Sequence, residues 1–166
     1  LIADTMRAGG PAIPAAGKIV AMDVPGARID RLKENLARVE GIDVALVQAD
    51  VLEAPTLALR EHNLPEEYDA VLIDVPCSNT GVMRHRADVK WRLQAGDFKK
   101  HPKQQLALLH AAARLVAPGG RLVYSTCSID AEENERVIAA FFNSRAGGPF
   151  KLETSVQSLP WVTGHD

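Results

Sequence analysis

Four short hydrophobic segments alternate with helical patterns along this chain of 166 residues. Each segment is rich in aliphatic side chains and ends at a polar or acidic residue, as a buried strand does. The segments are residues 18–23, 44–50, 68–75 and 121–126. Strands that alternate with helices favour parallel pairing, because a parallel connection needs a crossover. We therefore expect one α/β domain with a doubly wound, mainly parallel sheet.

The segments between the strands carry helical periodicity. Apolar residues recur at helical spacing after Pro25, a residue that fits the first turn of a helix, up to Gly41. Asp130 and Glu133 have the spacing of a capping box, in which both side chains bind N–H groups at a helix start. Pro118–Gly120 is expected to end the helix before it. The expected helices are residues 1–7, 25–40, 57–62, 103–116 and 131–143, with a fifth strand at 150–154.

Composition excludes several classes of protein. Hydrophobic residues make up 46% of the chain and charged residues 24%, as in ordinary globular domains, and no apolar run is long enough to span a membrane. The net charge is −2, yet residues 84–103 carry seven basic side chains against two acidic ones. Such a segment is typical either of a loop that faces a polyanion or of a solvated helix face.

Both cysteines lie where a predicted strand ends. Cys77 follows the strand at 68–75 and Cys127 follows the strand at 121–126. The carboxyl ends of parallel strands are where open sheets bind ligands, so two thiols there favour chemistry over simple packing. Neither thiol has a second Cys or His at zinc-ligand spacing, so we expect no metal. A thiol-redox protein with a reversible Cys77–Cys127 disulfide is an alternative, although no Cys-x-x-Cys motif is present.

Three of the four hydrophobic segments expected to form strands carry a carboxylate at their ends. Asp23, Asp50 and Asp74 share the edge of the sheet at which an acid can accept the ribose hydroxyls or the adenine amino group of a nucleotide-like cofactor. Each acid could instead cap the helix that follows it. The chain contains no Gly-x-Gly sequence, so the usual glycine-rich phosphate turn is not among these residues.

Several motifs occur together in an order that is recognisable. They are residues 74–82 (DVPCSNTGV), 88–92 (DVKWR), Gln105 with Leu108 and Leu109, 118–128 (PGGRLVYSTCS) and 132–135 (EENE). This combination, and above all the paired Pro-Cys and Thr-Cys motifs, resembles the NOL1/NOP2/Sun family of RNA cytosine-5 methyltransferases. The resemblance implies a Rossmann-like class I methyltransferase domain that uses S-adenosylmethionine. It also implies a cytoplasmic protein that acts on RNA, with ribosomal RNA the favoured substrate and transfer RNA the alternative.

The resemblance also implies roles for individual residues. Asp23 matches the acid that holds the cofactor ribose, Asp50 the acid near the adenine, and Asp74 the acid beside the methionine end and the target base. Cys127 matches the catalytic nucleophile and Cys77 the second cysteine, which helps to release the product. DNA cytosine methyltransferases attack with a Pro-Cys thiol, so Cys77 remains the rival nucleophile.

The basic segment is expected to hold the RNA substrate. The residues expected to contact it are Pro76, Arg84, Arg86, Lys90 and Arg92. Trp91 could stack on a base, or could simply pack against the protein.

The chain departs from the family pattern at its ends. The strand and glycine-rich cofactor loop that precede the first helix in the family, the upstream RNA-binding extension and the final strand do not occur in it. The absent first strand would be central in the sheet. We therefore expect residues 1–166 to be a methyltransferase domain incomplete at both ends, with weak affinity for S-adenosylmethionine. A non-catalytic RNA-binding fragment of the same fold is the alternative.

Overall fold

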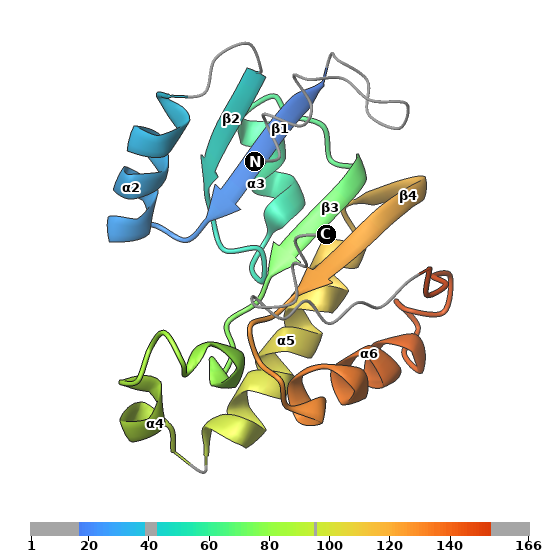
Figure 1. Ribbon diagram of the computed structural model, residues 1–166. Coiled ribbons are helices and arrows are strands. Elements are labelled where there is room, and N and C mark those ends of the chain that lie inside the picture. Colours follow the sequence, from blue (N-terminus) through green and yellow to red (C-terminus); the bar gives the residue numbers. More distant parts are fainter. Residues whose placement is uncertain (1–16, 39–42, 95, 154–166) are drawn as a thin grey trace, which may run out of the picture.

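The computed structural model describes residues 17–38, 43–94 and 96–153, so the helix predicted at residues 1–7 lies outside the described residues. Strands and helices alternate along these ranges (Figure 1). The elements are β1 (Lys18–Asp23), α2 (Ala27–Leu36), β2 (Asp43–Gln48), α3 (Pro55–Glu61), β3 (Tyr68–Asp74), η1 (Thr80–Val82), α4 (Val89–Arg92), α5 (Asp97–Ala113), β4 (Val116–Ser125), η2 (Ala131–Glu133) and α6 (Glu135–Phe142). Here η denotes a short 3₁₀ helix.

The strands form two parallel pairs. β1 pairs with β2 up to Asp23 opposite Gln48, and β3 pairs with β4 up to Asp74 opposite Ser125. Within the described residues, no backbone ladder joins one pair to the other. All four arrows point the same way in Figure 1, so the carboxyl ends of the strands share one side of the molecule. The predicted parallel α/β arrangement is confirmed, with the sheet divided into two pairs.

Side chains connect the two pairs where the backbone does not. Val47 of β2, Leu59 of α3 and Leu115 form a buried cluster. Met22 of β1 and Val71 of β3 pack against this cluster from the two pairs. Burial of this apolar surface is therefore what joins β1–β2 to β3–β4 in the described part of the chain.

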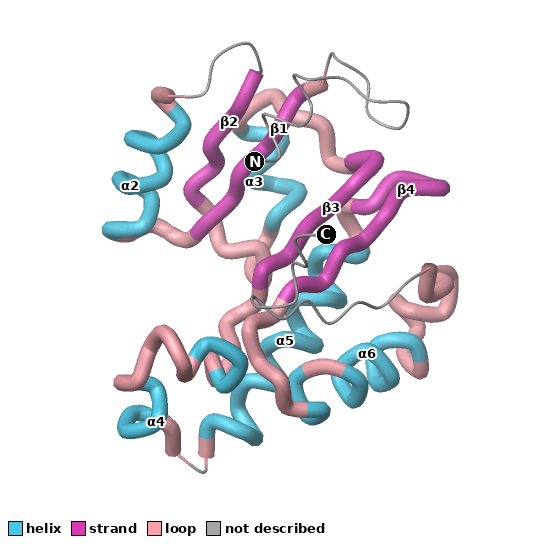
Figure 2. Tube along the Cα trace, in the orientation of Figure 1, coloured by secondary structure: helices cyan, strands magenta, loops and turns pink. Residues whose placement is uncertain are grey.

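Helices α5 and α6 cover one face of the β3–β4 pair (Figure 2). Leu109 of α5 and Phe141 of α6 are buried against Ile73 and Tyr124, which are register partners. Leu72 and Val123, the preceding register partners, point to the other face and remain about half exposed. The helices thus hold the two strands from one side, near the carboxyl ends that lead to the two cysteines.

Three of the expected elements differ from the structure. Helix α5 begins at Asp97 and continues through Pro102, because packing of its later residues outweighs the loss of one hydrogen bond. Strand β4 begins at Val116 and includes Pro118–Gly120, since an irregularity in its register with β3 accommodates them. Residues 150–153 form no strand. Within the described ranges, no helix is both long and apolar enough to cross a membrane.

Candidate active site

The carboxyl ends of β3 and β4 bring the two cysteines into contact. Asp74 and Ser125 are the last register partners of the pair, and Cys77 and Cys127 follow within three residues of them. Their Sγ atoms lie 2.7 Å apart as free thiols, so one can donate a hydrogen bond to the other. Cys77 is buried and Cys127 is partly buried. The two thiols therefore form one site at the expected edge of the sheet.

Asn79 connects the two cysteine loops. Its Nδ2 donates to the Cys77 carbonyl at 2.9 Å, and its Oδ1 accepts from the Cys127 thiol at 3.1 Å. Asn79 has a left-handed backbone with φ of 62°, a conformation that Asn tolerates better than most residues. Sequence reasoning did not single out this residue; the turn-forming Ser-Asn-Thr-Gly run after the Pro-Cys motif was the available signal.

A glycine is required at residue 81 because the backbone there closely approaches the loop that carries Cys127. Its backbone N–H donates to the Cys127 carbonyl at 3.0 Å. A Cβ atom at this position would lie 2.7 Å from the Cys127 carbonyl oxygen and 3.1 Å from Cγ2 of Ile129. Because the obstacle is backbone, any side chain at residue 81 would displace the segment that carries Cys127.

The surroundings of Cys127 favour its neutral thiol. Burial raises the pKa of Cys127 to about 12, and the hydrogen-bonded Cys77 and the Asp74 carboxylate act in the same direction. The sequence predicts a helix start near Asp130, which would stabilise the thiolate, but the direction of the pKa shift could not be derived without knowing which groups surround Cys127. In the structure, burial and the contacts with Cys77 and Asp74 outweigh any such stabilisation of the thiolate.

The capping box predicted for Asp130 and Glu133 is wrong. The Asp130 carboxylate accepts from the hydroxyls of Thr80 at 2.7 Å and Ser128 at 3.0 Å. The Glu133 carboxylate accepts from the backbone N–H of Ser78 at 3.0 Å. No side chain caps η2. Pairing of β3 with β4 places the Cys77 loop beside this segment, and its donors outcompete the local helix end.

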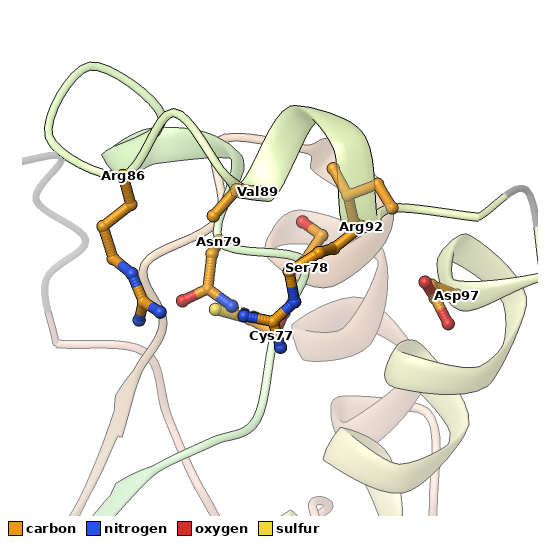
Figure 3. Close-up of a pocket in the computed structure, with 8 residues that line it drawn as sticks. Cys77, Ser78, Asn79, Arg86, Val89, Arg92 and Asp97 are labelled. Atoms are coloured by element: carbon orange, nitrogen blue, oxygen red, sulfur yellow. Dashed lines mark hydrogen bonds between the residues drawn. The ribbon is translucent and has the colours of Figure 1, made fainter.

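A cavity of about 170 Å³ opens beside Cys77 (Figure 3). It is lined by Cys77, Ser78, Asn79, Arg86, Val89, Arg92, Leu93 and Asp97. Figure 3 shows the Arg86 and Arg92 side chains extending toward the part of the cavity around Cys77 and Asn79. Both guanidinium groups also approach Asp88, at 3.7 Å and 3.1 Å. The cavity thus combines a thiol, an amide, the Asp97 carboxylate and two guanidinium groups, which suits a polar ligand.

The other predicted RNA contacts lie outside this lining. Arg84 and Lys90 are exposed on the same segment, and Pro76 uses its carbonyl to accept from Gln105. The Trp91 side chain is 83% exposed, with the Lys90 ammonium 5.5 Å from its ring centre. The alternative that Trp91 packs into the protein is therefore wrong.

The carboxylates at the strand ends have local contacts. Oδ1 of Asp23 accepts from the N–H of Val24, and Oδ1 of Asp50 from the N–H of Leu52, both at 2.8 Å. These bonds lie in the turns before α2 and α3, whose N-cap residues are Gly26 and Ala54, so the alternative that Asp23 and Asp50 cap the following helices is wrong. Each carboxylate has further lone pairs for a ligand. Asp74 is exposed at the end of β3. In the described part of the chain, no three His, Cys, Asp or Glu side chains are grouped as metal ligands.

The family model described as 16S rRNA methyltransferase RsmB/F matches residues 12–158. The chain is similar to the probable ribosomal RNA small subunit methyltransferase B of Coxiella burnetii, with 35% identity over 162 residues that cover 92% of this chain and 37% of the relative. It is 41% identical over 129 residues to ribosomal RNA small subunit methyltransferase B of Sodalis glossinidius, covering 78% of this chain and 28% of the relative. The chain thus spans about a third of the length of these relatives.

Two solved structures share the fold. One is PH0851, with a TM-score of 0.68 and 41% identity, covering 76% of this chain and 28% of that one. The other is NSun6 from Pyrococcus horikoshii with SFG, with a TM-score of 0.63 and 31% identity, covering 76% of this chain and 30% of that one. These similarities confirm the predicted Rossmann-like fold.

Proposed function

Because this chain belongs to the 16S rRNA methyltransferase RsmB/F family, we propose that its protein transfers a methyl group from S-adenosylmethionine to carbon 5 of a cytosine in ribosomal RNA. Membership confirms the resemblance inferred from the sequence. The observation that best supports the reaction is the contact between the Cys77 and Cys127 thiols beside a cavity with two arginines. Transfer RNA is the alternative substrate, and the cytoplasm the proposed location.

The proposed reaction needs an attacking thiol because carbon 5 of cytosine is a poor nucleophile, and a second thiol can assist the release of the first. Addition of the Cys127 thiolate to carbon 6 forms a C–S bond and moves the ring π electrons toward carbon 5. Carbon 5 then forms a bond to the methyl group as the bond between that methyl group and the sulfonium sulfur breaks, which leaves a neutral thioether. Carbon 5 loses its proton to a base, and the electrons of the C–H bond expel the Cys127 thiolate. The contact between Cys77 and Cys127 supports a role for Cys77 in this release. Asp74 would hydrogen-bond the cytosine edge.

The carboxylates at the strand ends fit the cofactor. Asp23 and Asp50 use Oδ1 for backbone contacts, so Oδ2 of each can accept from ribose hydroxyls or an adenine amino group. When bound, S-adenosylmethionine supplies an electrophilic methyl group on a sulfonium. The similarity to the NSun6 structure with SFG, an analogue of this cofactor, supports the assignment.

The arginine-lined cavity suits the RNA. A cytosine must leave its stack before a thiol can reach carbon 6, and its flanking phosphates then need cationic partners. Arg86 and Arg92 lie where they could bind those phosphates beside Cys77. Trp91, exposed on the same segment, offers a ring for stacking. Pro76, Arg84 and Lys90 remain further predicted contacts.

A trapping experiment tests the proposal. The full-length protein is mixed with S-adenosylmethionine and RNA that contains 5-azacytosine, which retains the covalent adduct, and the linked peptide is mapped by mass spectrometry. We expect the link at Cys127, and none in Cys127→Ala. A link at Cys77 would reverse the two roles, and no link would favour a non-catalytic RNA-binding protein.

The thiol contact also suits the redox alternative. Two free thiols 2.7 Å apart need little movement to form a disulfide. The trapping experiment is therefore run with and without reductant. A redox protein would cycle between the disulfide and the two thiols without ever linking RNA.

A further inference from the structure

Glu133 is a fully buried carboxylate, 0% exposed, between the two cysteine loops. Oε2 accepts from the N–H of Ser78 at 3.0 Å, and Oε1 lies 3.2 Å from the hydroxyl of Ser128. Ser78 directly follows Cys77, and Ser128 directly follows Cys127. One carboxylate therefore binds the residue after each thiol.

Gln105 of α5 extends this contact to the other side of Cys77. Its Nε2 donates to Oε2 of Glu133 at 2.8 Å and to the carbonyl of Pro76 at 2.9 Å. Both partners are acceptors, which fixes the orientation of the amide. Pro76 and Ser78 flank Cys77, so Gln105 and Glu133 hold the backbone on both sides of the thiol.

A carboxyl side chain is unusual in this buried environment. Burying a carboxylate costs free energy unless it is hydrogen-bonded, and none of the ion pairs among the described residues includes Glu133. A carboxylate differs from an amide in having two acceptor oxygens. Oε2 accepts from the Ser78 N–H and from Gln105, while Oε1 lies 3.3 Å from the Ser78 nitrogen and 3.2 Å from the Ser128 hydroxyl, whose one proton is shared with Asp130. An apolar side chain could accept from neither loop, and an amide would replace one of the two acceptor oxygens by a donor.

We propose that Glu133 and Gln105 are positioning residues that hold the Cys77 and Cys127 loops so that the thiols meet. The consequence for catalysis rests on the proposed methyltransferase function, whereas the thiol geometry does not. Loss of either side chain should separate the thiols and slow methyl transfer without weakening cofactor binding, because neither residue is among the strand-end acids expected to hold the cofactor.

Disulfide formation measures the thiol contact directly. Diamide accepts two electrons and two protons as Cys77 and Cys127 form a disulfide. Iodoacetamide reports the reactivity of each thiol separately. We expect Glu133→Gln to lower the ratio of disulfide formation to alkylation about tenfold, as for loss of hydrogen bonds to a charged group. Glu135→Gln, two residues away and exposed, is the matched control and should leave the ratio unchanged.

A second variant tests the proposal independently if Glu133→Gln does not fold. Gln105→Met keeps the side-chain volume and removes both donated bonds, and it also removes Oε1, which has no partner. It should lower the same ratio, and in the full-length protein both variants should lower kcat with little change in KM for S-adenosylmethionine. An unchanged ratio in the folded variants overturns the proposal. A lowered ratio in a protein that never methylates RNA would support positioning and refute the methyltransferase function.

Discussion

At the scale of single residues, the protonation of Cys127 is the central chemical fact. Burial, Cys77 and Asp74 together raise its pKa to about 12, from an ordinary value of 9.0. In the proposed reaction the Cys127 thiolate attacks, and only a small fraction of the protein would carry that thiolate near neutral pH. The proposed reaction therefore requires that substrates or nearby groups favour loss of this proton.

The raised pKa predicts a pH dependence for Cys127. Alkylation by iodoacetamide should be slow at pH 8 and rise roughly tenfold per pH unit below the pKa of about 12. Cys77→Ala removes a hydrogen bond and a neighbouring charge that raise this pKa, so it should accelerate alkylation at a given pH. A rate that levels off below pH 8 in the parent protein would contradict this prediction.

The same shift predicts an effect on stability. The folded pKa lies above the unfolded one, so the neutral thiol stabilises the fold below about pH 9, and this contribution is lost as pH rises toward about 12. Cys127→Ala should therefore lose less stability than the parent between pH 8 and pH 10 in urea titrations. An equal loss in both proteins would argue against a raised pKa.

Substitution separates the proposed roles of the two cysteines. In the full-length protein, Cys127→Ala should abolish methyl transfer because no thiol adds to carbon 6. Cys77→Ala should instead accumulate RNA covalently bound to the protein, since release is impaired. Both are measured by methyl transfer from labelled cofactor and by gel mobility of the adduct. Full activity of Cys127→Ala would refute its role as nucleophile.

At the scale of elements, the loops after β3 and β4 behave as one unit. Asn79 and Gly81 of the first loop bind Cys127, while Glu133, at the end of η2, binds Ser78. None of these contacts is local in sequence. The position of each thiol therefore depends on a loop that belongs to the other strand.

Gly81 tests this dependence. Gly81→Ala should destabilise the protein by about 1–3 kcal/mol and displace Cys127, because the added Cβ would meet the Cys127 carbonyl oxygen at 2.7 Å. Gly96→Ala is the matched control, since nothing lies within 4 Å of a Cβ there and its φ is −68°. Urea unfolding and disulfide formation by diamide measure the two effects. Equal behaviour of both variants would rule out the close approach.

The short helix α4 presents an aromatic ring to solvent, which predicts a role in binding without a role in folding. Trp91→Ala should change stability by less than about 0.5 kcal/mol, because the side chain is 83% exposed. If the ring stacks on a base, RNA affinity of the full-length protein should fall by about 1–3 kcal/mol. Leu57→Ala, at an exposed apolar residue of α3, is the control. Unchanged affinity in an anisotropy titration would remove Trp91 from the interface.

At the scale of the whole molecule, the site is divided between the two strand pairs. Asp23 ends β1 and Asp50 follows β2, whereas Asp74 ends β3 and the two cysteines follow β3 and β4. Among the described residues only side chains join the pairs, and no ladder links β1 to β3. The distance between the thiols and the acids proposed to bind the cofactor therefore depends on how firmly the pairs are held together.

This division predicts weak cofactor binding by the 166 residues alone. The chain spans about a third of the length of its relatives, and among the described residues no backbone ladder holds β1–β2 against β3–β4. Calorimetry should detect little affinity of residues 1–166 for S-adenosylmethionine and clear affinity in the full-length protein. A micromolar signal from residues 1–166 would contradict this prediction.

Local patterns in the sequence were sufficient for the α/β class, the strands at β1 and β3, and the placement of Asp23, Asp74 and both cysteines at strand ends. Hydrophobic runs, helical periodicity and turn residues act over a few neighbours, and a single sequence displays them directly. The ends of α5 and β4 were missed, because packing and register there outweighed Pro102 and the Pro118–Gly120 turn signal.

The chemistry of the site was decided by the tertiary structure. The 2.7 Å thiol contact joins residues 50 positions apart, and the bond from Ser78 to Glu133 joins residues 55 positions apart. The raised pKa of Cys127 depends on its burial and on the same distant neighbours. The β3–β4 register brings these residues together, and it turned the expected capping box of Asp130 and Glu133 into a bridge between the cysteine loops. Burial and pairing across strands are properties of the assembled fold, so no local pattern could reveal them.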